Sequence, residues 1–136
     1  MPAATILEAT AVLRVSGSWS VCLGPEGVFQ RFARRQTRNR EQEYRLGMLA
    51  SCVGARAMSS LDKRGIRHQV IRVVVRRGHE ARVAIRVCIE CEIDDRTAQE
   101  CVTQSVQSDP MFGLLTQTDR VDWLFETHSS IAIRIS

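Results

Sequence analysis

The stretch that most constrains the fold is residues 41–65, because it predicts one long, buried helix. It contains no proline, has few charges at its centre and ends in Lys63 and Arg64, followed by a glycine that can stop a helix. Glycine inside a helix costs about 1 kcal/mol relative to alanine. Gly47 and Gly54 therefore indicate that another backbone approaches the middle of this helix.

Alternating hydrophobicity predicts strands on both sides of that helix. Residues 5–15, 19–23 and 28–32 are separated by turn signals and read as a small antiparallel meander. Residues 68–76 and 81–93 follow the helix and predict a long hairpin with one buried face.

The end of the chain predicts two more helices and a closing strand. Asp94 or Asp95 can cap the first helix, and Asp109 can cap a short helix that begins with a proline. Residues 121–125 and 130–135 read as a closing strand or strand pair. We therefore predict one α+β domain over residues 1–136, in the order βββ-α-ββ-α-α-β.

Composition agrees with a globular domain, at 44% apolar and 25% charged residues. The first residues lack a basic start followed by an apolar core, and no apolar run reaches the roughly 20 residues of a membrane helix. We expect a cytoplasmic protein without a membrane span. Five cysteines, an odd number, predict reduced thiols.

The net charge of +4 is concentrated in the segment from Arg31 to Arg40, which holds five arginines. This segment reads as a solvated loop or edge strand, or alternatively as a rim that binds anions. Nucleic acid is disfavoured as a partner, because aromatic residues for base stacking are scarce and no nucleic-acid-binding motif is present.

Most of the cysteines and histidines predict no site. Cys88 and Cys91 are three apart in a strand, so their side chains point to opposite faces and cannot form a redox or zinc pair. Cys22 and Cys101 read as small packing residues. The three histidines share no metal-ligand spacing and are expected in surface or turn positions, so we predict no metal and no cofactor.

Cys52 is the candidate reactive thiol. Arg56 follows it by one helical turn and Arg45 precedes it by two, and a guanidinium close to the sulfur favours the thiolate. A thiolate is the nucleophile of peroxide reduction and of disulfide exchange. The alternative is a core cysteine in a glycine-rich helix.

The sequence LGMLASCVGARAMSSLDKRGI, residues 46–66, resembles the central helix of the OsmC/Ohr family, the osmotically induced and organic-hydroperoxide-resistance proteins. Members carry an Ala-Ser-Cys or Ala-Ala-Cys step there, and the expected element order is similar over nearly the whole chain. The resemblance implies an intertwined homodimer whose two central helices pack together, with active sites at the interface. The small residues around Cys52 suit such a helix–helix contact.

The resemblance also implies site residues. Cys52 fits the thiol that attacks the peroxide, and Arg14 is the candidate for an arginine of the N-terminal sheet that poises it. The glutamate expected at the helix start falls on Gln42, with Glu43 beside it. A second cysteine should precede Pro110, but Asp109 stands there.

Two functions follow from this pattern. The first is an OsmC-like redox protein, a thiol-dependent organic hydroperoxide reductase whose Cys52 is regenerated by an external thiol. The second is a non-catalytic dimeric module that binds a small, anionic ligand at its interface. A charge on Asp109 close to Cys52 would raise the pKa of the thiol and oppose reactivity.

Overall fold

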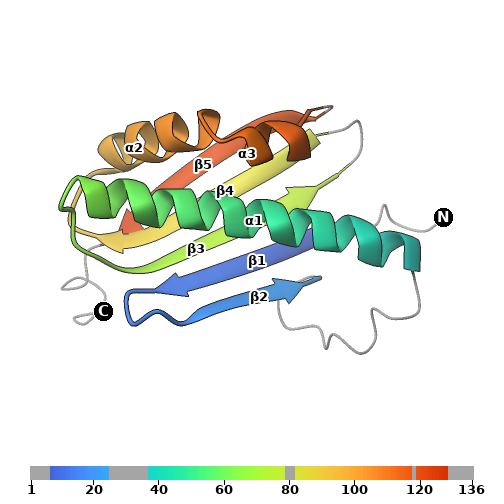
Figure 1. The fold of residues 1–136 in the computed structure, drawn as a ribbon, viewed down its shortest axis with the longest axis horizontal. Helices are drawn as coiled ribbons and strands as arrows, with labels where there is room; N and C mark the ends of the chain where they lie inside the picture. The colour runs from blue at the N-terminus through green and yellow to red at the C-terminus, as the bar shows by residue number, and fades with distance from the viewer. Residues whose placement is uncertain (1–6, 25–36, 79–81, 118, 129–136) are drawn as a thin grey trace.

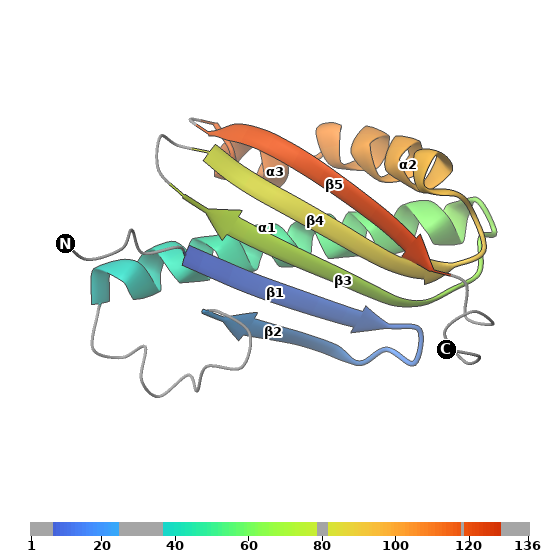
Figure 2. The same cartoon turned by 180° about the vertical axis from the view of Figure 1, so that it is seen from behind.

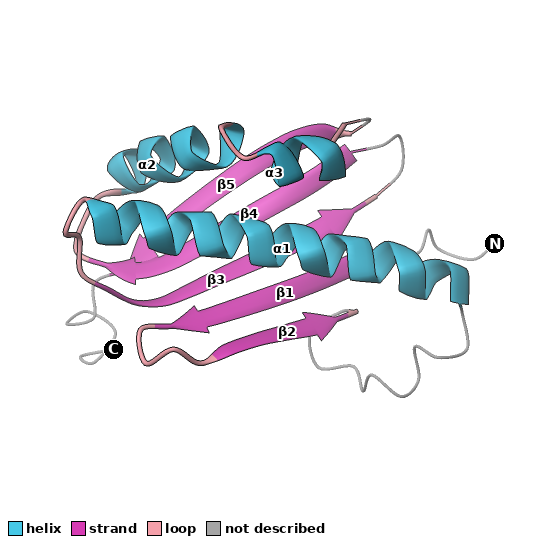
Figure 3. Cartoon of the chain, in the orientation of Figure 1, coloured by secondary structure: helices cyan, strands magenta, loops and turns pink. Residues whose placement is uncertain are grey.

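A five-stranded sheet carries three helices on one of its faces (Figures 1–3). The computed structural model describes residues 7–24, 37–78, 82–117 and 119–128. The elements are β1 (Leu7–Arg14), β2 (Trp19–Leu23), α1 (Thr37–Lys63), β3 (His68–Arg77), β4 (Arg82–Cys91), α2 (Asp95–Gln107), α3 (Pro110–Leu115) and β5 (Arg120–His128). The predicted α+β class is confirmed, and no described helix combines the length and apolarity needed to span a membrane.

The strand order in the sheet is β2-β1-β3-β4-β5. All neighbouring strands are antiparallel except β4 and β5, which run parallel and are connected through α2 and α3. The first hairpin and the β3–β4 hairpin are as predicted. The strands expected over residues 28–32 and 130–135 lie outside the described residues.

The core lies between the sheet and the helices. The predicted inward faces of β3 and β4 are confirmed, since Ile71, Val73, Val75, Val83, Ile85, Val87 and Ile89 are buried. Phe112 of α3 stacks on Trp123 of β5 with ring centroids 5.7 Å apart, and Trp123 stacks on Phe125 at 5.5 Å. These rings hold α3 against the sheet and thereby set the position of Asp109, the residue that precedes it.

The long helix begins at Thr37, four residues earlier than predicted. Reading residues 37–40 as loop or edge strand was wrong, because arginine is a good helix former and no proline interrupts the segment. Residues 31–36 of the basic segment lie outside the described residues. The predicted end is confirmed: Gly65 has φ of 67°, and its N–H donates to the carbonyl of Asp62.

The two helix glycines pack against the sheet. A Cβ placed on Gly54 would lie 2.5 Å from Leu13 Cδ1, and one on Gly47 would lie 2.7 Å from Leu23 Cδ2. The glycines were predicted to face another backbone, but the atoms closest to them are side-chain atoms of β1 and β2. Ser51, Ala55 and Ser59 follow Gly47 at intervals of four and continue its row of small residues along α1.

Strand β4 ends at Cys91, two residues before the predicted end. Asp94 is the N-cap of α2, and its carboxylate accepts a hydrogen bond from the backbone N–H of Thr97 at 2.8 Å. Glu92 and Ile93 form the bend that connects β4 to this N-cap. Val15, predicted on the core face of the first strand, lies beyond β1 and is exposed.

Candidate functional site

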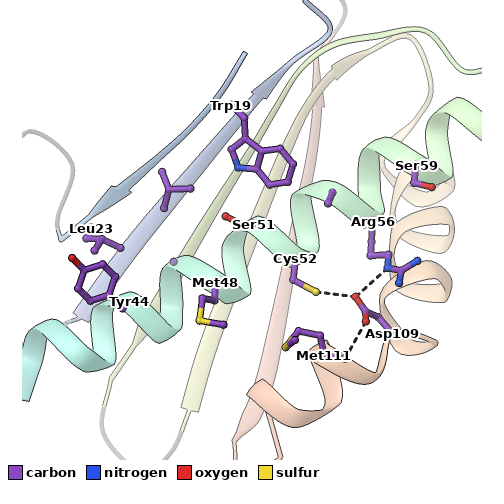
Figure 4. A pocket seen from close by; sticks show the side chains of 13 residues that line it. Trp19, Leu23, Tyr44, Met48, Ser51, Cys52, Arg56, Ser59, Asp109 and Met111 are labelled. Atoms are coloured by element: carbon purple, nitrogen blue, oxygen red, sulfur yellow. Dashed lines mark hydrogen bonds and ion pairs between the residues drawn. The ribbon is translucent and has the colours of Figure 1, made fainter. Parts of the chain in front are cut away.

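A groove of about 770 Å³ runs along α1, between β2 on one side and α3 on the other (Figure 4). Most of its wall is apolar, and the exposed large apolar side chains range from 42% for Val21 to 54% for Met48. Polar groups gather at one place, around Cys52. The lining residues are Trp19, Val21, Leu23, Tyr44, Gly47, Met48, Ser51, Cys52, Ala55, Arg56, Ser59, Asp109 and Met111.

Asp109 joins the polar groups of the groove. It is the N-cap of α3, with a proline at the first helical position, and its Oδ1 accepts the N–H of Met111 at 3.0 Å. Its Oδ2 accepts both the Cys52 S–H at 2.9 Å and the Arg56 Nε–H at 3.0 Å. This carboxylate therefore binds α1 to α3 at the position of the thiol, as Figure 4 shows.

The thiol of Cys52 is held in its protonated form. Burial, the hydrogen bond to Asp109 and the charge of Asp109 raise its pKa from 9.0 to about 12, against a smaller opposing effect of Arg56. Hydrogen bonds from Cys52 and Arg56 lower the pKa of Asp109 to about 2. At neutral pH the site thus contains a neutral thiol, a carboxylate and a guanidinium.

Of the two arginines expected to favour a thiolate, Arg56 does lower the pKa of Cys52, but burial and Asp109 outweigh it. Arg56 is paired with Asp109, which stands between it and the sulfur (Figure 4). Arg45 donates from Nη2 to the carbonyl of Leu115 at 3.3 Å, at the far end of α3. The predicted effects of Arg56 and of Asp109 on the pKa of the thiol are both confirmed in direction, and the rise prevails.

The other candidate residues, Glu43 and Arg14, do not line this groove. Glu43 precedes Cys52 by nine residues, which places it about 13 Å away along α1 and on the opposite side. It is buried near Gly24, at the end of β2. Arg14 is exposed at the end of β1 and alternates with Leu13, so it points to the sheet face away from the helices.

All five cysteines are free. Cys91 and Cys101 are buried in the core, as expected of packing residues. Cys88 points to the sheet face away from the helices, where its S–H donates to Glu126 Oε2 at 3.7 Å. Cys22 pairs with Thr10 in the register, not with an inward-facing residue of β1, so it lies on that same outer face. The sheet separates both thiols from Cys52.

His68 departs from the surface or turn position expected for the histidines. It is buried, and its Nε2 lies 2.8 Å from Asp62 Oδ1. The pair connects the last turn of α1 to the start of β3, so its role is structural. Among the described residues, no group of three or more His, Cys, Asp or Glu side chains could hold a metal ion.

The apolar wall of the groove was missed in the sequence, although a signal was present. Tyr44, Met48 and Cys52 follow at intervals of four, which places them along one side of a helix. Comparison with protein-family models, with curated proteins and with solved structures finds no match to this chain. The function of the groove has to be argued from its geometry and from the resemblance of the central helix.

Proposed function

We propose that this chain is an OsmC-like homodimer whose groove beside Cys52 binds a small ligand without thiol catalysis. One observation carries the proposal: Cys52 donates its S–H to Asp109, which also holds Arg56. A nucleophilic cysteine needs the thiolate form, and this arrangement favours the thiol. Asp109 stands where the resemblance leads us to expect a second cysteine, so the usual partner for a disulfide with Cys52 is missing.

The groove supports a ligand with an apolar body and a polar end. Its volume of about 770 Å³ falls in the range of small-molecule sites. Trp19, Tyr44 and Met48 would contact the body, while Arg56, whose side chain is 43% exposed, offers hydrogen-bond donors to a polar or anionic end. Because the apolar wall is half exposed in one chain, a second copy packed along α1 would cover part of it.

A second candidate is the thiol-dependent reduction of organic hydroperoxides. It is favoured by Cys52, which lines an open groove next to a guanidinium. In that case the Cys52 thiolate would attack the hydroperoxide, the O–O bond would break to release an alcohol, and Cys52 would become a sulfenic acid that an external thiol reduces. Cys52 would first have to lose the proton that its hydrogen bond to Asp109 helps it to keep.

Two measurements separate these functions. Binding of 8-anilinonaphthalene-1-sulfonate, an aromatic anion, is followed by fluorescence in the wild type, in Ala55→Phe, which fills the groove, and in Ala84→Phe on the outer sheet face. We expect only Ala55→Phe to abolish binding. Loss of cumene hydroperoxide with dithiothreitol should be no faster than in Cys52→Ser. Peroxide loss faster than in Cys52→Ser would reject the non-catalytic proposal and support the reductase. Loss of fluorescent-probe binding only in Ala84→Phe would show that the ligand binds on the outer sheet face and not in the groove.

A further inference from the structure

We propose that the sulfur atoms of Met48, Cys52 and Met111 form a binding site for a soft monovalent metal ion, Cu(I) or Ag(I). Met48 and Cys52 are four residues apart on the groove side of α1, and Met111 lies in the first turn of α3. Figure 4 shows the three sulfur atoms on the same side of α1, in the space between α1 and α3. Thiolate and thioether ligands are those that select Cu(I).

The exposure and flexibility of the two methionine side chains suit them as metal ligands. Met48 and Met111 are about half exposed, at 54% and 47%, so neither sulfur is locked into the core. Methionine is unbranched and has three rotatable bonds, so both thioethers can move toward Cys52 without a shift of the backbone.

The charged groups at the site are also compatible with a bound cation. Asp109 Oδ2 lies 2.9 Å from the sulfur of Cys52, so a positive ion on that sulfur would be close to a carboxylate. Arg56 would repel the ion, but its charge is paired with the same carboxylate at 3.0 Å. Binding forms a sulfur–metal bond, and the S–H bond of Cys52 breaks with its proton going to the buffer. No electron is transferred, because the metal enters as Cu(I).

Two exposed methionines have an ordinary explanation, which is that they are apolar surface for a ligand or a second copy. Leucine separates the two explanations, because it has a similar size and hydrophobicity but offers no sulfur. The metal site is also independent of the proposed function, since a groove that binds an organic ligand needs apolar walls and no thioether.

The experiment is a competition for Cu(I) against bicinchoninate under anaerobic, reducing conditions. The full chain carries Cys22→Ser and Cys88→Ser, which removes the two other partly exposed thiols. In this background we compare Met48→Leu, Met111→Leu and Cys52→Ser, with Met58→Leu as the control because Met58 packs against the core. Circular dichroism verifies that each variant is folded, and Ag(I) repeats the titration with an ion that resists oxidation.

We expect one Cu(I) per chain, a loss of affinity of about tenfold or more for each groove methionine, and loss of the site in Cys52→Ser. Met58→Leu should match the background. If both groove methionines can be replaced by leucine within about twofold of the background affinity, the thioethers are not ligands and the proposal fails. It also fails if Cys52→Ser still binds one Cu(I) with unchanged affinity.

Discussion

At the scale of single residues, burial and Asp109 together keep Cys52 protonated. The carboxylate accepts three hydrogen bonds, from the Cys52 thiol, the Arg56 guanidinium and the Met111 N–H. The same contacts hold the carboxylate charged and the thiol neutral. A substitution that removes the charge of Asp109 but keeps its shape should therefore release both Cys52 and Arg56.

Asp109→Asn should make Cys52 more reactive. Without the carboxylate the thiol loses its strongest acceptor, and Arg56 becomes available to stabilise the thiolate, so the pKa of Cys52 falls from its value of about 12. We expect faster alkylation of Cys52 by iodoacetamide at pH 8, measured by mass spectrometry of the Cys52 peptide. Asp122→Asn, which removes a carboxylate on the outer face of the sheet, is the control. An unchanged rate in Asp109→Asn would mean that burial alone holds the proton.

The same substitution predicts a pH dependence of stability. The pKa of Asp109 is lowered from 3.8 to about 2 in the folded chain. Its stabilising effect is therefore fully present above pH 3.8 and is lost as the pH falls toward 2, where the folded carboxylate also takes up a proton. In urea unfolding, the wild type should exceed Asp109→Asn in free energy of unfolding at pH 6, and the difference should shrink between pH 3.8 and about 2. A difference that stays constant over this window would contradict the assignment.

At the scale of elements, α1 lies closest to the sheet at two glycines, Gly47 and Gly54. The contact at Gly54 is the tighter one, because Leu13 is almost completely buried and has no room to rotate. At Gly47 the opposing side chain is Leu23, which is only partly buried. The two glycines should therefore respond differently to the same change.

Gly54→Ala should destabilise the fold by up to about 2 kcal/mol, because an overpacking cost of about 1–3 kcal/mol is offset by a gain in helix propensity of about 1 kcal/mol. Gly47→Ala should be close to neutral, since Leu23 can move. Chemical unfolding of both variants beside the wild type measures the free energies. Equal effects at the two positions would show that α1 shifts as a whole to accept either methyl group.

Elements with a clear hydrophobic pattern could be predicted from the sequence, and features that depend on tertiary contacts could not. Strands β3 and β4 were predicted with their buried faces because apolar and polar residues alternate strictly, so only one face of each strand can be the buried one. The start of α1 was placed too late, because a run of arginines carries helix propensity but no hydrophobic period. The partner of Arg56 could not be predicted, since it depends on how Phe112 and Trp123 bring α3 against the sheet. The parallel pairing of β4 and β5 was likewise invisible in the hydrophobic pattern.

At the scale of the whole molecule, exposed apolar side chains distinguish the helix side, which holds the groove, from the outer face of the sheet. Met48, Tyr44 and Trp19 are half exposed beside the groove, whereas the outer sheet face carries ion pairs such as Arg76–Glu8 and Arg86–Glu126. If two copies associate along α1, as we propose, a charge in the groove should separate them and the same charge on the outer face should not.

Met48→Glu and Leu124→Glu form a matched pair for this question, because the two residues are 54% and 53% exposed. We expect sedimentation at twice the mass of one chain for the wild type and for Leu124→Glu, and at the mass of one chain for Met48→Glu. Charge in place of an apolar side chain at an interface loses the burial and leaves an unpaired carboxylate. Dimers in both variants, or monomers in all three proteins, would reject association through the groove.

The parallel pairing of β4 with β5 has a consequence for the order of events during folding. Strands β3 and β4 are neighbours in sequence and need only a hairpin to meet. Strand β5 meets β4 only after α2 and α3 have carried the chain back along the sheet, which requires closure of a longer loop. Asp109 lies inside that returning segment. The hydrogen bond to Cys52 therefore forms late, and until then a nascent chain presents this thiol without the carboxylate that later restrains it.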